Sequence, residues 1–319
     1  MLVTVVINAM KDSVEVLRSV APAVQRTRQQ ASDAKEAKKL LGLTDPTGDA
    51  YRSDAVHPLY GEGKIHPDNV AALNAAAGDA LLRRTQIQDE VQINPGTSSL
   101  LLFGSPTSEG LSRVAFDYEQ VPEIEGLARR GAVLDLAYAW NLDPNKLGGG
   151  RVARYVPGKG VIDRPAWQID DLRHTGASAY LRPEVDANGL ITEDYLLVTR
   201  VRNFLSEEAL ARGQFLVSFG GAHGTGTRAV ELLLKDRKLL ADVLEQLKSS
   251  QARVTGLGGL PKAYQLLFRV SSIKHSPAGS IPRALELVDT VTLPDTDAVW
   301  DTAYRVALTR LERWYQEQP

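Results

Sequence analysis

The sequence predicts an α/β fold built on a mixed sheet, with peripheral N-terminal helices and a C-terminal helix. Continuous apolar runs that end in glycine turns or lead into polar stretches are typical of strands buried on both faces. Two further segments alternate apolar and polar residues, like the arms of a half-exposed strand pair. The predicted strands are 98–103, 194–201, 214–219, 263–273 and 283–293, and the terminal helix is 297–316. Because only one connection is plainly strand, loop and helix, we expect a mixed sheet rather than an all-parallel one.

The chain divides into a helical N-terminal extension, 1–90, and a ligand-binding α/β domain, 91–319. In the extension, apolar spacing predicts helices at 12–41 and 67–84, and the Pro- and Gly-rich stretch between them predicts an irregular connector. In the α/β domain, the segment 119–190 is rich in glycine, proline and arginine. Its turn signals predict a β-rich insertion of short strands and hairpins.

Composition excludes several classes of function. The chain has 319 residues, 43% of them hydrophobic and 24% charged, with a net charge of -2 and no cysteine. Disulfides, cysteine nucleophiles and thiolate metal sites are therefore excluded, and the paired spacing of metal ligands is missing as well. No global basic field favours nucleic acid, and no apolar run reaches the ~18 residues of a membrane span. The short apolar start "MLVTVVIN" does not resemble a signal peptide, so we expect a cytoplasmic protein without a membrane partner.

Two glycine-containing loops follow two predicted buried strands. The first is "FGSPTSEG", 103–110, and the second is "GGAHGTGTR", 220–228, which leads into a helix. In open α/β sheets, ligands bind beyond the carboxyl ends of the strands. Glycines allow a ligand to approach the backbone, and free N–H groups at a helix start hold phosphate or carboxylate. Tight turning requires only one or two glycines, so the sequence favours a ligand site here over a packed turn.

The second loop departs from two known phosphate-binding fingerprints. Thr227 and Arg228 stand where an ATP-hydrolysing P-loop has lysine and a hydroxyl residue. The dinucleotide pattern GxGxxG/A is met by Gly224, Gly226 and Ala229, but the acidic residue expected ~20 positions further on falls in a predicted helix. Neither fingerprint therefore identifies a cofactor.

The loop also resembles the PGGxGTxxE motif of the LOG-like (lysine-decarboxylase-like) nucleotide phosphoribohydrolases and their Rossmann-like superfamily. Gly220, Gly221, Gly226, Thr227 and Glu231 supply its parts, and "LLLFGSPTSEG" is similar to the family's first strand and loop. Phe219 replaces the proline, four residues instead of one separate the glycine pair from Gly226, and Glu231 lies one position later. The resemblance covers two loops only. It implies a Rossmann-like sheet and nucleotide binding more than it implies hydrolysis.

From these loops we expect a nucleotide or related phosphorylated ligand and a sensor or regulatory role. The candidate ligand-binding residues are Gly104, Ser105, Thr107, Ser108, Gly220, Gly221, His223, Gly224, Thr225, Gly226, Thr227 and Arg228. The first alternative is cleavage of an N-glycosidic bond in a nucleotide, with Glu231, Glu109 and His223 as candidate catalytic residues. The second is an interaction protein, a homo-oligomer assembled through its outer helices, in which the loops are merely turns. The cofactor is unknown, and no metal is expected.

Overall fold

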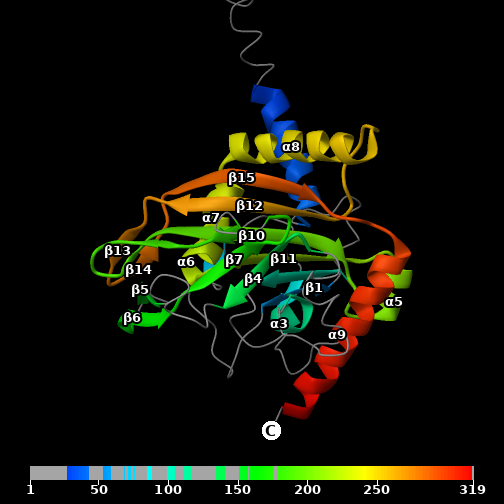
Figure 1. Ribbon diagram of the computed structural model, residues 1–319. Helices are drawn as coiled ribbons and strands as arrows, with labels where there is room; N and C mark the ends of the chain where they lie inside the picture. Colours follow the sequence, from blue (N-terminus) through cyan, green and yellow to red (C-terminus); the bar gives the residue numbers. More distant parts are fainter. Residues whose placement is uncertain are drawn as a thin grey trace, which may run out of the picture.

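The computed structural model describes the C-terminal two fifths of the chain continuously and the earlier part in segments (Figure 1). The described residues are 27–42, 53–58, 68, 71–72, 75, 85–87, 99–104, 111–116, 134–140, 151–156, 158–174 and 179–317. The predicted helix segments 12–26 and most of 67–84 lie outside them, as do residues 105–110 of the first glycine loop.

The main sheet is mixed, as the sequence predicts. Among the described residues it has eight strands, in the order β15-β12-β10-β11-β3-β1-β2, with β9 paired to β10. The pairs β11–β3, β3–β1 and β1–β2 are parallel, whereas the pairs β10–β11, β10–β12 and β12–β15 are antiparallel. The bounds are β1 Ser53–Pro58, β2 Thr85–Ile87, β3 Leu100–Phe103, β9 Glu184–Val185, β10 Ile191–Arg202, β11 Phe215–Gly221, β12 Tyr264–Ser271 and β15 Ala284–Thr292.

The predicted strands at 98–103, 194–201 and 214–219 are confirmed as β3, β10 and β11, and the predicted pair 263–273 and 283–293 is β12 with β15. One prediction is wrong: the stretch expected to be an irregular connector contains β1, which pairs with β3 inside the main sheet. The sequence of β1, "SDAVHP", does not alternate apolar and polar residues, and a strand prediction depends on that alternation.

Alternate residues of each central strand face opposite sides of the sheet, and each side has its own apolar core. On one side, Val217 and Phe219 pack with Leu240 and Leu244 of α8, together with Leu41, which directly follows the helical segment 27–40. On the other side, Leu216 lies in the cluster that contains Trp300 of α9. Figure 1 shows α8 (Arg237–Thr255) across one face of the sheet, and α9 (Asp297–Glu317) and α3 (Leu111–Phe116) beyond the other.

The segment 119–190 contributes small sheets outside the main one. These are β4 Leu136–Trp140 with β7 Trp167–Asp171 and β8 Tyr180–Leu181, and the hairpin β5 Arg151–Val156 with β6 Gly160–Pro165. A further two-stranded sheet joins β13 Lys274–Ser276 to β14 Gly279–Ile281. The β4 sheet matters most for the site, because its residues pack against the loop that follows β11.

The helix predicted after β11 is interrupted twice. It forms α6 (Gly224–Arg228), α7 (Val230–Lys235) and α8, with the short α5 (Glu207–Ala211) before β11. Asp236 ends α7 and caps α8 by accepting the backbone N–H groups of Lys238 and Leu239. Gly256, at φ 67°, ends α8 in the left-handed conformation that favours glycine.

Candidate functional site

The two predicted loops begin side by side. Strands β3 and β11 are parallel neighbours, and the Gly104 N–H donates to the carbonyl oxygen of Phe219 at 2.9 Å. On its other side, β11 pairs antiparallel with β10, so this edge lies where parallel pairing gives way to antiparallel pairing. Of the first loop's candidates, Ser105, Thr107, Ser108 and Glu109 lie outside the described residues.

In the second loop, two backbone N–H groups that could hold a ligand already donate to this chain. The Gly226 N–H donates to the carboxylate of Asp194 at 2.6 Å, and the Gly221 N–H donates to Thr227 Oγ1 at 2.8 Å. Asp194 is fully buried near the start of β10, and it also accepts the Tyr195 N–H at 2.8 Å. The loop is thus built around an anion, and that anion is a side chain of the protein itself.

Close packing accounts for three of the glycines. A Cβ on Gly220 would lie under 3.0 Å from the Tyr138 hydroxyl and the Gly104 carbonyl oxygen. A Cβ on Gly226 would meet the carbonyl oxygen of Tyr195 as closely, and one on Gly221 would meet the loop's own backbone. The Tyr138 hydroxyl also donates to the Gly220 carbonyl oxygen at 2.8 Å. These positions require glycine whether or not a ligand approaches.

His223 is buried, and both ring nitrogens face groups of the protein. Its Nε2 accepts the backbone N–H of Trp167 in β7 at 3.1 Å, which places the proton of a neutral ring on Nδ1. Nδ1 lies 3.5 Å from the Asp194 carboxylate. Burial, reinforced by the Asp194 charge, raises the pKa of the nearby Tyr138 hydroxyl, which therefore stays protonated. In this arrangement His223 joins the loop to the β4 sheet and is not poised as an acid or base toward a ligand.

The remaining loop candidates are partly or fully enclosed. Thr225 is fully buried, and its hydroxyl has no hydrogen-bond partner among the described residues. Arg228 lies 3.9 Å from Asp68 and 3.6 Å from Glu231, while Glu231 also lies 3.9 Å from Lys235. Arg154 forms a buried ion pair with Asp68. Glu231, a candidate catalytic carboxylate, is therefore shared between two cations.

Sequence reasoning missed the residues that anchor the loop, namely Asp194, Tyr138 and Trp167. One signal was available for Asp194, because it directly precedes the apolar run "YLLV" of the predicted strand 194–201. Burial of a lone carboxylate is costly, so such a residue needs donors close by. Tyr138 and Trp167 lie in the insertion, where the sequence carries no signal that points to the loop.

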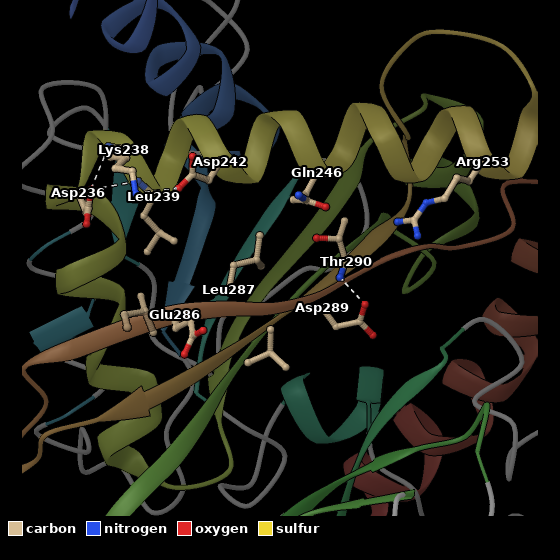
Figure 2. Close-up of a pocket in the computed structure, with 12 residues that line it drawn as sticks. Asp236, Lys238, Leu239, Asp242, Gln246, Arg253, Glu286, Leu287, Asp289 and Thr290 are labelled. Carbon is tan, nitrogen blue, oxygen red and sulfur yellow. Dashed lines mark hydrogen bonds and ion pairs between the residues drawn. The ribbon is translucent and has the colours of Figure 1, made fainter.

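A second feature at the same end of the sheet is a trough between α8 and the edge strand β15 (Figure 2). Leu287 of β15 pairs with Phe268 of β12, which pairs with Leu196 of β10, which in turn pairs with Gly221 of the glycine loop. Leu287 and Gly221 are therefore separated by three strand spacings, or about 14 Å. The middle of the trough is a hollow of about 620 Å³. Figure 2 shows Gln246 and Arg253 reaching from α8 toward the strand, and Leu287 and Thr290 pointing back toward the helix.

One end of the trough is basic. A hollow of about 690 Å³ lies where α7, α8 and the start of β15 meet, and it shares Asp236, Lys238, Leu239 and Leu285 with the middle of the trough. The cations that line it are Lys235, Arg237, Lys238 and Arg283. Its single carboxylate, Asp236, is engaged as the cap of α8. We call these four cations with their hollow the basic pocket.

The cations of the basic pocket have weak partners within the described part of the chain. Lys235 and Lys238 lie 3.9 Å from Glu231 and Asp242, at side-chain exposures of 75% and 78%. Pairs this long and this exposed contribute little. Arg237 and Arg283 form no ion pair with another described residue. The pocket therefore presents a local excess of positive charge on a protein whose net charge is -2.

Comparisons with protein-family models, curated proteins and solved structures found no match for this chain. Among the helices that the structure describes, none combines the length and the apolar run needed to cross a bilayer. Within the same residues, no three histidine or acidic side chains are grouped as metal ligands.

Proposed function

We propose that this protein binds a nucleotide or related phosphorylated small molecule, with the phosphate held in the basic pocket. The observation that carries the proposal is the hollow of about 690 Å³ with four cations and one carboxylate that is already a helix cap. Arginine and lysine are the side chains that pair with phosphate, arginine through two parallel hydrogen bonds.

The position of the pocket in the fold supports the proposal. The trough lies at the end of the sheet where β3 and β11 finish, which is the end that open, Rossmann-like sheets use for ligands. The prediction that the two glycine loops hold the phosphate stays a prediction. Two of the loop's N–H groups are committed to Asp194 and Thr227, and the buried Asp194 charge would repel an anion placed beside it.

The proposed function is ligand binding and does not include hydrolysis of the ligand. The hydrolase alternative depends on Glu231, Glu109 and His223. Of these, Glu231 lies between two cations, His223 faces groups of the chain itself, and Glu109 is outside the described residues. A sensor or regulatory role requires only that the ligand binds. Assembly through the outer helices and a cytoplasmic location stay predictions.

Thermal unfolding with added ligands tests this function. Inorganic phosphate, pyrophosphate and the four nucleoside diphosphates are titrated to millimolar concentration. A ligand present at 100 times its Kd adds about 2.7 kcal/mol, which raises the Tm by about 5 °C. No rise with any of these ligands would refute the proposal.

Binding variants locate the site. The double variant Arg237→Ala and Arg283→Ala removes two charge-assisted contacts, and we expect it to weaken phosphate ligands about 10- to 100-fold. The matched control is Arg305→Ala, because Arg305 is an exposed arginine on α9, beyond the other face of the sheet. Equal loss in the control, or wild-type affinity in the double variant, would place the phosphate elsewhere.

A further inference from the structure

We infer that the ligand is a nucleotide that extends from the basic pocket along β15, with its base or sugar held by Gln246 and Thr290. This inference rests on the proposed function and narrows the class of ligand. It is carried by the polar groups in the middle of the trough, which the phosphate itself would not reach.

Thr290 is the first of these groups. Only 8% of the residue is exposed, and its hydroxyl has no hydrogen-bond partner among the described residues. Its backbone, in contrast, is satisfied: the N–H donates to Asp289 Oδ1 at 2.7 Å, and the carbonyl oxygen accepts from Ser250 Oγ. Buried hydroxyls in proteins nearly always have a partner. Because the Thr290 side chain points into the trough toward α8 (Figure 2), a ligand in the trough can supply that partner.

Gln246 is the second group. It is exposed on α8, lines the same hollow, and its side chain reaches toward β15 (Figure 2). An amide offers a donor and an acceptor side by side, which matches the donor and acceptor edge of a nucleobase. Leu239 and Leu287 line the trough between Lys238 and these two polar groups (Figure 2), and they provide an apolar surface for a sugar or base.

Spacing separates a nucleotide from simpler phosphates. Lys238 at the basic pocket and Gln246 lie eight residues apart on one face of α8, or about 12 Å along the helix. Phosphate and pyrophosphate are too short to contact both ends of this span. A nucleoside diphosphate carries phosphates at one end and hydrogen-bonding groups at the other, so a single molecule can occupy both hollows.

The bulge in β15 favours a small molecule over an added strand. The pairing register of β12 with β15 shifts between Leu267 and Phe268, which leaves Val288 without a directly opposite residue. Bulges twist an edge strand away from further pairing. The backbone of Thr290 is already bonded within the chain, so a peptide would not find a regular row of free groups along β15.

Isothermal titration with pyrophosphate and with ADP, GDP, CDP and UDP tests the inference. We expect at least one nucleoside diphosphate to bind about 10-fold tighter than pyrophosphate. Gln246→Ala and Thr290→Val should each weaken that nucleotide about fivefold, since each removes one hydrogen bond, and should leave pyrophosphate within about twofold. Glu245→Ala is the control, because Glu245 is an exposed neighbour on α8 that does not line the trough.

The outcomes separate this inference from the proposed function. If pyrophosphate binds as tightly as every nucleotide, or if the two variants affect both ligands equally, the inference is overturned while phosphate binding stands. If neither ligand depends on Arg237 and Arg283, the proposed function fails with it. Thr290→Val has nearly the shape of threonine and removes an unpartnered hydroxyl, so the variant should fold, and an unchanged Tm without ligand verifies this.

Discussion

Replacing Asp194 by asparagine tests whether the glycine loop is held by an internal carboxylate. The fully buried carboxylate accepts N–H groups from Gly226 at 2.6 Å and from Tyr195 at 2.8 Å, and His223 Nδ1 lies 3.5 Å away. Asparagine has the same shape but only one accepting oxygen. In either orientation of the amide, its NH₂ group faces a backbone N–H, and that donor is left buried without an acceptor.

The expected loss follows from these contacts. Hydrogen bonds to a charged group contribute about 1.5–3 kcal/mol each, and a buried donor left unpaired costs about 1–3 kcal/mol. We therefore expect Asp194→Asn to lower the free energy of unfolding by about 3 kcal/mol. Urea unfolding followed by tryptophan fluorescence and by circular dichroism measures it. Asp242→Asn is the control, since Asp242 is half-exposed and only weakly paired. A loss below about 0.5 kcal/mol in Asp194→Asn would refute the account of the loop.

Two further predictions concern stability. Gly226→Ala should cost about 1–3 kcal/mol in urea unfolding, because the new Cβ would lie under 3.0 Å from the Tyr195 carbonyl oxygen. Gly258→Ala, with nothing within 4 Å of its Cβ, should be at least as stable as wild type, and an equal cost at both positions would contradict this explanation. Burial alone would raise the pKa of Asp171, but hydrogen bonds from Arg173 outweigh it and lower that pKa. A lowered pKa adds stability above the unfolded-state value and loses it as the pH falls through the folded-state value, so Arg173→Gln should cost about 1 kcal/mol at pH 7 and less at pH 3, which lies below the ordinary pKa of 3.8. A cost that is the same at both pH values would exclude the ion pair as its cause.

The sequence predicts the strands of the sheet well where their apolar runs are buried on both faces. Strands β3, β10 and β11 are of this kind, because strands buried on both faces consist of nearly continuous apolar residues. Strand β1 has the sequence "SDAVHP", which contains no continuous apolar run, and it joins the sheet through backbone pairing with β3. Pairing partners depend on contacts between distant segments, and a single sequence does not encode them in a local pattern.

In the candidate site too, some features follow from the local sequence and others depend on contacts between distant segments. Local pattern is enough to predict that strands at 98–103 and 214–219 end in turns that require glycine, and the Gly104 N–H bond to Phe219 brings those turns together. The basic pocket has no local signal. Lys235, Arg237 and Lys238 read as an ordinary solvated helix junction until β15 places Arg283 beside them. The sequence therefore indicates the end of the sheet near which the proposed site lies, without indicating the cations.

Whether a glycine loop receives an external or an internal anion depends on register. Gly221 stands opposite Leu196 in the antiparallel pair of β11 and β10, and this register places Asp194 beside the turn that begins α6. A shift of one residue would move the Asp194 side chain to the other face of β10 and remove the carboxylate from the loop. The same glycines and the same N–H groups would then face an unfilled position. The glycine motif alone thus indicates that the loop favours a negatively charged group. The register of the neighbouring strand determines whether that group is a side chain of the protein or a ligand.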